Sequence, residues 1–146
     1  MTMPPRGIAP PPSDSPSGAT LLLTPPLALA LALATRPDAS PARLAVLLLW
    51  APWLEEIVFR RGLQQGLQDR LGPGPVAAGA AMGLTAIAFT AAHLLFNPAP
   101  WAAWTLLPAL ALGGLYRATG RVGPCVALHA LFNLIWIAAT ARPASL

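Results

Sequence analysis

The chain has 146 residues, of which 55% are hydrophobic and only 10% are charged, and its mean hydropathy is +0.60. This length suits one domain, but soluble domains carry about 25% charged residues, so the composition argues against a soluble protein and favours a membrane protein. The pI is near 11.1, yet the nine cationic residues, all arginine, are spread along the chain without a concentrated patch, so nucleic acid is not an expected partner.

The N-terminal part of the chain divides into a polar tail and an apolar segment. Residues 1–19 are rich in Pro, Ser and Gly, which predicts a disordered tail. Residues 20–35 are apolar and lie at the short limit for a transmembrane helix. Pro25 and Pro26 are expected to break its first turns. The apolar core of a signal peptide is an alternative, but the preceding tail is long and rich in proline, so we expect a short first span.

The next helix carries two adjacent carboxylates. After a polar turn over residues 36–43, this helix is expected to begin at Arg43 or Leu44. Pro52 is expected to kink it, because proline removes one backbone hydrogen bond. The polar stretch 61–70 should then run along the membrane interface before a Gly- and Pro-rich turn ends the helix.

Three more apolar segments follow, over residues 75–96, 101–116 and 122–141. In the first of them, Gly79 and Gly83 have the GxxxG spacing that lets transmembrane helices approach closely. The predicted fold is therefore all-α, a polytopic membrane bundle of about five transmembrane helices in which a four-helix core follows the short N-terminal span. Residues 20–141 would form this single domain, and residues 142–146 a short C-terminal tail.

The arginine positions favour one orientation by a small excess. With the N-terminus in the cytoplasm, five arginines fall inside and three outside, leaving out Arg60. The inside set is Arg6, Arg61, Arg70, Arg117 and Arg121, and the outside set is Arg36, Arg43 and Arg142. We expect a multi-pass protein of a bacterial inner (plasma) membrane with this orientation.

The acidic pair, Glu55 and Glu56, is energetically the most unfavourable feature of the apolar segments, because it places two carboxylates in one of them. Ionisable groups at bilayer depth are rare and usually mark a functional site, although a pair just past the end of a span could also serve as solvated anchors. Glu56 shares a helix face with Arg60, four residues on, so the two can pair. Glu55 is rotated from its neighbour by about 100°, which leaves one carboxylate neutralised and the other free to act.

Three further polar side chains lie in later spans: His93, His129 and Asn133. His129 and Asn133 are four residues apart and share a face, and Phe89 could wall the pocket over His93 by the same spacing. Each has a simpler interpretation alone, because a histidine in a span can bond a neighbouring carbonyl and an asparagine can link two helices. Together they predict one buried site.

Two carboxylates and two imidazoles can activate water for peptide hydrolysis. One carboxylate would act as general base while imidazole or amide donors stabilise an oxyanion. Two His and one Glu are also zinc ligands, so Glu55, His93 and His129 are the candidate metal ligands. HExxH is absent, however, and we expect no required cofactor. Cys125 is the only cysteine and is expected to be a packed small hydrophobe rather than a nucleophile.

The three motifs together resemble those of the CAAX-type intramembrane endoproteases, also called the CPBP family. EEIVFR at 55–60 matches the family's EExxxR, FTAAH at 89–93 its FxxxH, and HALFN at 129–133 its HxxxN, and the resemblance extends over about residues 43–140. It implies a glutamate-dependent intramembrane endopeptidase with the following roles. Glu55 would activate water and Glu56, held by Arg60, would support it; His93 would orient the water, and His129 and Asn133 would form the oxyanion hole.

The chain departs from the family in its span count. Members commonly have more spans before the acidic motif, whereas at most one precedes it here. The substrate surface that those spans supply would then be missing, or a partner subunit or a second copy of the chain would complete it. The expected substrate is a membrane protein or peptide, such as one with a C-terminal sorting signal, rather than a prenylated CAAX protein. Two alternatives are a non-catalytic membrane interaction or bacteriocin-immunity protein on the same scaffold, and a proton or ion conduit.

Overall fold

The computed structural model describes residues 18–35 and 40–140, with the side chains of the first segment described over residues 25–33. Every regular element in this part of the chain is a helix, which confirms the all-α prediction. Most of the expected N-terminal tail (residues 1–17) and the whole expected C-terminal tail (residues 142–146) lie outside the described residues.

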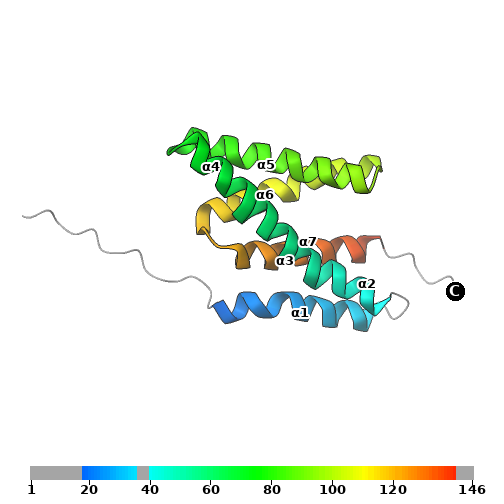
Figure 1. The fold of residues 1–146 in the computed structure, drawn as a ribbon. Helices are drawn as coiled ribbons and strands as arrows, with labels where there is room; N and C mark the ends of the chain where they lie inside the picture. Colours follow the sequence, from blue (N-terminus) through cyan, green and yellow to red (C-terminus); the bar gives the residue numbers. More distant parts are fainter. Residues whose placement is uncertain (1–17, 36–39, 141–146) are drawn as a thin grey trace, which may run out of the picture.

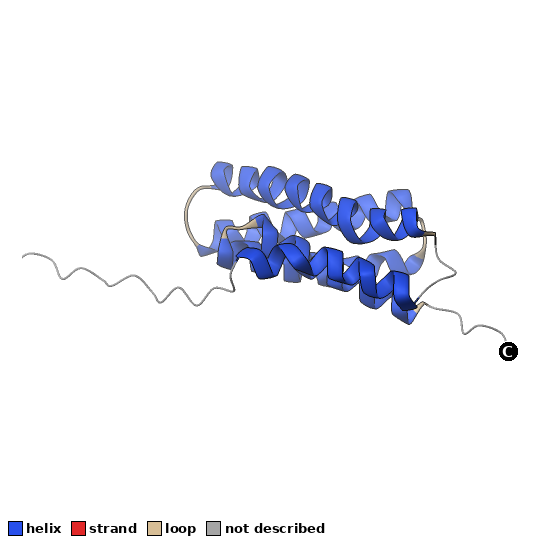
Figure 2. Cartoon of the chain, turned by 90° about the horizontal axis from the view of Figure 1, so that it is seen from below, coloured by secondary structure: helices blue, strands red, loops and turns tan. Residues whose placement is uncertain are grey.

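Four helices lie side by side in a row. Their order across the row is α1 (Gly18–Thr35), α7 (Val122–Ala139), α6 (Leu106–Thr119) and α5 (Pro75–Phe96), each packed on the next (Figure 1). A fifth, continuous helical segment runs from Pro41 to Leu71 and crosses the row diagonally (Figure 1). Figure 2 shows this segment on one face of the row. We call it the acidic helix, because it carries the paired glutamates.

The acidic helix alternates between α-helical and wider π-helical stretches. It consists of α2 (Pro41–Ala45), η1 (Val46–Trp50), α3 (Ala51–Glu56), η2 (Ile57–Gln64) and α4 (Gln65–Leu71), of which η1 and η2 are π-helical. It begins at Pro41, two residues before the predicted start. Ser40 Oγ accepts a hydrogen bond from Arg43 N–H at 3.5 Å, and proline suits the first turn of a helix.

The predicted distortion at Pro52 takes the form of a π-helical stretch rather than a break. Pro52 is buried and the backbone stays helical on both sides of it. Just before it, Ala51 N–H donates to Val46 O, five residues back, instead of to the residue four back. π-Helical turns of this kind are common at functional sites, and this one ends at Trp50, five residues before the first glutamate.

Helix α1 contradicts one prediction. It is unbroken through Pro25 and Pro26, and it begins at Gly18, inside the expected tail. A proline requires φ near −65°, which is a helical value, so the pair is compatible with a continuous helix. Ala32 of α1 is fully buried against Leu44 and Leu48 of the acidic helix.

The close helix approach also lies elsewhere than predicted. A Cβ added at Gly79 or Gly83 would meet no atom within 4 Å, so the GxxxG pair faces open space in this structure. At Gly113 of α6, an added Cβ would lie 2.7 Å from Met82 Cγ. The glycine that lets two helices approach is therefore Gly113, because the crossing of α6 with α5 and the acidic helix falls there.

The remaining helix bounds follow the predictions with small shifts. Helix α5 has the predicted ends, and a short 3₁₀ turn, η3 (Pro100–Thr105), leads into α6. Helix α6 runs to Thr119, three residues past the predicted end, where Gly120 stops it with a φ of 64°. Helix α7 ends at Ala139 rather than residue 141.

Two helices in the described part are long and apolar enough to cross a membrane. They are α5, with 22 residues, and α7, with 18. Large apolar side chains point outward on the bundle, among them Phe96, Leu95 and Trp104, which are 90%, 80% and 71% exposed. Such a surface suits lipid, while the predicted total of five spans remains a prediction.

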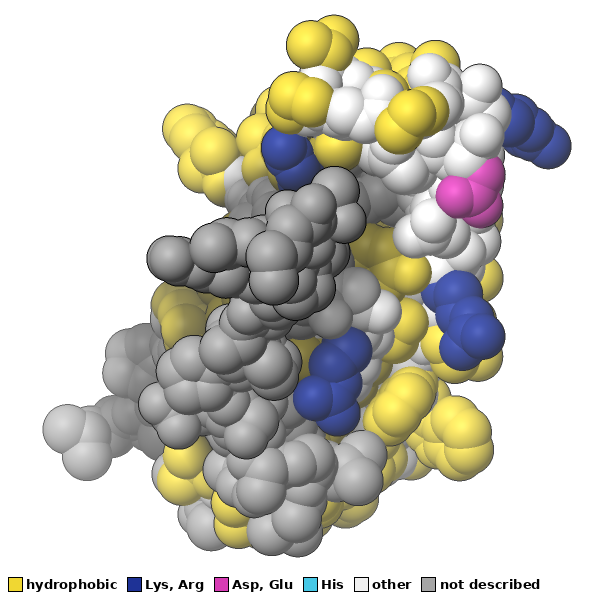
Figure 3. Space-filling view, turned by 90° about the vertical axis from the view of Figure 1, so that its left-hand side faces the viewer, with side chains coloured by type: hydrophobic (Ala, Val, Ile, Leu, Met, Phe, Trp, Pro, Cys, Tyr) yellow, Lys and Arg dark blue, Asp and Glu magenta, His cyan; other side chains and the backbone are white. Residues whose placement is uncertain are grey.

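One end of the bundle is rich in exposed arginines. The turn between α4 and α5 and the turn between α6 and α7 both lie at this end (Figure 1). Arginine side chains are spread over it with one acidic side chain among them (Figure 3). The exposed arginines of the adjoining helix ends and turns are Arg61, Arg70, Arg117 and Arg121.

Candidate active site

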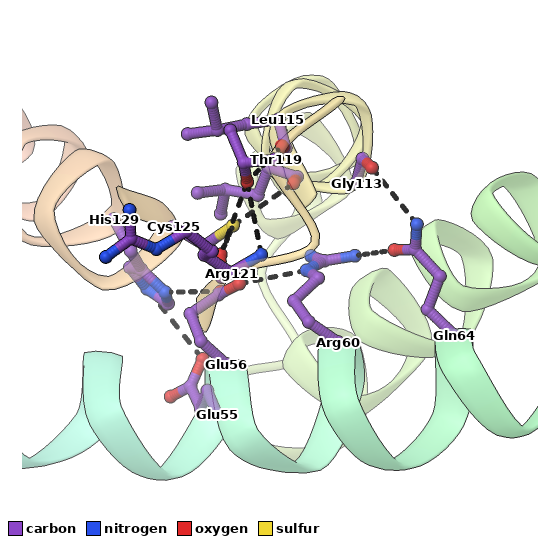
Figure 4. Close-up of polar contacts among 11 residues, drawn as sticks. Glu55, Glu56, Arg60, Gln64, Gly113, Leu115, Thr119, Arg121, Cys125 and His129 are labelled. Carbon is purple, nitrogen blue, oxygen red and sulfur yellow. Dashed lines mark hydrogen bonds and ion pairs between the residues drawn. The ribbon is translucent and has the colours of Figure 1, made fainter. Parts of the chain in front are cut away.

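A buried row of polar side chains lies along the inner face of the acidic helix. Glu56 and Arg60 have side chains that are 0% exposed, and Arg60 Nε donates to Glu56 Oε2 at 2.9 Å. Arg60 Nη1 donates to Gln64 Oε1 at 3.1 Å, so three residues at four-residue intervals form one chain of hydrogen bonds (Figure 4). A buried charge is tolerable only when it is paired and hydrogen-bonded, and this row meets both conditions for Glu56.

Gln64 ties this row to α6. Its Nε2 donates to Gly113 O at 3.0 Å (Figure 4). Sequence reasoning missed both residues of this link. The signal for Gln64 was present, since it follows Arg60 by the same four-residue spacing that paired Arg60 with Glu56. Gly113 carried no such signal, because a close approach between elements distant in sequence has no local pattern.

His129 of α7 contacts the second oxygen of Glu56. The two atoms, His129 Nδ1 and Glu56 Oε1, are 2.9 Å apart and buried (Figure 4). Because Glu56 is paired with Arg60, its carboxylate is the acceptor and Nδ1 carries the proton. The ring is thereby oriented with Nε2 turned toward the other glutamate.

Glu55 Oε2 lies between two imidazole rings. It is 3.8 Å from His129 Nε2 and 4.0 Å from His93 Nε2. This oxygen is buried and has no hydrogen-bond partner among the described residues, although the Glu55 side chain as a whole is 30% exposed. The structure thus brings Glu55, His93 and His129 together from three helices, as the motifs predicted.

Phe89 holds His93 in place. Their rings stack with centroids 4.4 Å apart and planes at 26°, and His93 Nδ1 lies 3.0 Å from Phe89 O. A carbonyl oxygen can only accept, so Nδ1 is protonated and Nε2 of the neutral ring is the acceptor facing Glu55. Phe89 also meets the His129 ring at 5.9 Å and packs against Phe59. The predicted aromatic wall is therefore present, and it touches both histidines.

Asn133 contacts a backbone carbonyl of the acidic helix. Its Nδ2 donates to Leu47 O at 2.7 Å. This contact matches the simpler interpretation of the residue, a link between two helices, and its predicted place in an oxyanion hole stays a prediction. Cys125 is fully buried among Leu112 and Tyr116, as expected for a packed small hydrophobe.

The three candidate metal ligands do not form a metal site in this geometry. Ligands of a tetrahedral zinc ion lie about 2.0–2.2 Å from the metal and therefore about 3.4 Å from one another. The imidazole nitrogens here lie farther from Glu55 Oε2, at 3.8 and 4.0 Å, and no set of three or more His, Cys, Asp and Glu side chains in the described residues is arranged to hold a metal ion. The donor types suit zinc but the spacing between them does not, so the residues as arranged here do not fit a zinc ion.

The described residues define an all-helical bundle with an apolar outer surface and a buried polar site, in which one carboxylate is neutralised and a second lies near two imidazoles. A family model places the chain more closely. Residues 37–135 match the model of the Rce1-like type II CAAX prenyl endopeptidases, and the chain belongs to this family of membrane-bound CAAX-type proteases. Comparisons with curated proteins and with solved structures gave no match.

Proposed function

We propose that the chain is an intramembrane endopeptidase in which Glu55 activates a water molecule for attack on a peptide bond of a membrane-associated protein. The observation that carries this proposal is the position of Glu55 Oε2, a buried oxygen without a hydrogen-bond partner among the described residues and within 4.0 Å of two imidazole nitrogens. Its neighbour Glu56 is already paired, so Glu55 is the free base of the two.

Glu55 and His93 are spaced to hold the attacking water. Their acceptor atoms, Oε2 and Nε2, are 4.0 Å apart. One water molecule can donate to both with hydrogen bonds of about 2.8 Å. Glu55 takes one proton from this water as the oxygen adds to the substrate carbonyl carbon, and then passes that proton to the leaving amide nitrogen as the C–N bond breaks.

His129 supplies the donor for the oxyanion. With Nδ1 bonded to Glu56, the imidazolium form carries a second N–H at Nε2, beside Glu55 Oε2. The Glu56 carboxylate holds the ring in this orientation, while Arg60 holds the carboxylate in place. Charge on the tetrahedral intermediate is then met by a fixed donor in a site shielded from water.

The substrate reaches the site between α3 and α5. These two helices diverge, since no Cα of α3 lies within 8 Å of a Cα of α5, whereas η2 and α4 pack against α5. Glu55 and His93 meet between these helices, and their side chains are 30% and 33% exposed. Exposed apolar side chains of the acidic helix follow in sequence on both sides of Glu55, including Leu54 and Val58, and they suit a hydrophobic substrate segment such as a C-terminal sorting signal.

The test compares Glu55→Gln with the wild type in liposomes. Two substrates are offered: a reporter protein anchored by a single C-terminal hydrophobic helix, and a farnesylated CAAX peptide with a quenched fluorophore. Losing the general base should lower cleavage by about 10²–10⁴-fold while insertion and folding are retained. Asp69→Asn is the matched control, because Asp69 is an exposed carboxylate of α4, and it should cleave like the wild type.

Equal cleavage by Glu55→Gln and the wild type would contradict the proposal. Full biological activity of a Glu55→Gln, His129→Ala double variant would instead favour a non-catalytic interaction or immunity protein. A proton leak through liposomes that depends on Glu55 would favour a conduit. Zinc content, measured together with chelator sensitivity of cleavage, tests the metal question separately.

A further inference from the structure

Leu47 O is a carbonyl without its usual backbone donor. In an α-helix it would accept from Ala51 N–H, but that group donates to Val46 O instead. In a π-helical register it would accept from residue 52, which is proline and has no N–H. The sequence and the local register together therefore leave this carbonyl to be satisfied by a side chain, which is a strong requirement inside a bilayer.

Asn133 supplies the missing donor. Its Nδ2 donates to Leu47 O at 2.7 Å, a short and therefore well-formed bond. Asn133 follows His129 by one turn of α7, and His129 bonds Glu56 on the same acidic helix. Helix α7 is thus attached to the acidic helix at two points, one on each side of Glu55 along the chain.

We propose that Asn133 is a positioning residue that replaces the backbone donor absent at Pro52, and that this bond keeps the acidic helix in the register that places Glu55 beside His129. The inference rests on the proposed endopeptidase function. Without this bond Leu47 O would be unsatisfied, which would favour a shift of this stretch of the acidic helix to another register and would move Glu55 away from His129. With the bond in place, His129 Nε2 lies 3.8 Å from Glu55 Oε2.

The test uses Pro52→Ala, which returns an N–H to the backbone. Leu47 O then gains a donor in either register, from residue 52 in a π-helical turn or from Ala51 in an α-helical one. Asn133→Ala alone should lower kcat by about 100-fold, the effect of a misplacement of about 1 Å in a catalytic site, with KM little changed. In the Pro52→Ala background the same substitution should lower kcat by at most about 10-fold.

A role in the oxyanion hole predicts a different result. Removal of one oxyanion donor lowers kcat by about 10²–10³-fold, and a backbone N–H at residue 52 would not restore it. An equal loss of kcat in both backgrounds would therefore overturn the proposal. Pro108→Ala is the matched control, because it also returns an N–H to a helix, but in α6 and away from Leu47 O, the carbonyl that Asn133 bonds. It should therefore not rescue Asn133→Ala.

A second readout needs no substrate. Thermal unfolding in detergent should show a lower Tm for Asn133→Ala than for the wild type, and a smaller difference when both proteins carry Pro52→Ala. If Asn133→Ala alone fails to fold, recovery of folding in the double variant supports the proposal and failure to recover overturns it. Because this readout is independent of cleavage, an inactive wild type would contradict the proposed function without deciding the role of Asn133.

Discussion

For single residues, the four-residue spacing within the motifs was enough to predict which side chains of one helix contact each other. The pairing of Glu56 with Arg60 and the stacking of Phe89 on His93 both follow from this spacing. The convergence of three helices could be predicted only because several costly polar groups in one apolar chain need one another. The hydrogen-bonding tautomers could not be predicted, since they depend on which atom each ring nitrogen meets.

Substitution of Gln64 tests whether the buried row of Glu56, Arg60 and Gln64 stabilises the fold. Gln64→Met keeps its length but removes the acceptor for Arg60 Nη1 and the donor for Gly113 O. Leaving these buried groups unsatisfied should lower the free energy of unfolding by about 1–3 kcal/mol, measured by denaturant titration in detergent. Cleavage should fall as well, because Arg60 positions Glu56.

The neighbouring glutamine provides the control for that substitution. Gln65 is exposed and bonds Asp69 on the surface of α4, so Gln65→Met should change stability by less than about 0.5 kcal/mol. A Gln64→Met protein as stable as Gln65→Met would show that the buried row does not stabilise the fold.

At the level of helices, the sequence predicted which segments are helical better than it predicted how they pack. Helix α5 has its predicted bounds, because Pro75 suits a helix start and Asn97-Pro98 forces an end. The GxxxG pair was misassigned, since its spacing marks a surface that permits close packing without saying which neighbour uses it. The π-helical stretches escaped prediction because the tertiary contacts of the acidic helix select them.

Gly113 is the position where helix packing is most constrained. A methyl group there would lie 2.7 Å from Met82 Cγ and 3.2 Å from Gln64 Oε1, which is fixed by two hydrogen bonds. Gly113→Ala should therefore lower the free energy of unfolding by about 1–3 kcal/mol, as overpacking does, despite the better helix propensity of alanine.

The adjacent Gly114 separates the effect of close helix packing on stability from the effect of helix propensity. A Cβ added at Gly114 would meet nothing within 4 Å, so Gly114→Ala should be neutral or stabilising by up to about 1 kcal/mol. Thermal unfolding of both variants in detergent checks the pair. Equal behaviour of the two alanine variants would contradict the packing role assigned to Gly113.

For the whole molecule, composition and hydropathy indicated a membrane bundle, and the arrangement of the helices explains how a short chain assembles its site. The diagonal crossing of the acidic helix brings it close to α1 at one end and α5 at the other (Figure 1). Where the acidic helix has moved away from α5, the side chains still meet, since His93 Nε2 near the end of α5 lies 4.0 Å from Glu55 Oε2. This crossing angle is a property of packed surfaces and leaves no periodic signal in the sequence.

The end of the bundle that carries the exposed arginines should face the cytoplasm. Starting from a Cys125→Ser background, Ala118→Cys places a thiol at this end and Asn97→Cys places one at the opposite end, both at exposed positions. A membrane-impermeant maleimide added to intact cells should label residue 97 and spare residue 118, because cytoplasmic loops are enriched in arginine. Labelling of residue 118 and protection of residue 97 would reverse the orientation.

The long-range hydrogen bonds of the acidic helix determine when its buried site can form during synthesis and membrane insertion. Gln64 bonds Gly113, 49 residues later, and Glu56 bonds His129, 73 residues later. When the acidic helix leaves the ribosome, its Glu56–Arg60 pair has only Gln64 as a further partner, within the same helix. Exposing that pair to hydrocarbon is costly, so it must stay in the interface or in the translocation channel until α6 and α7 arrive. The site is thus completed only when α7 inserts, and a protein truncated before His129 lacks the α7 partner of Glu56.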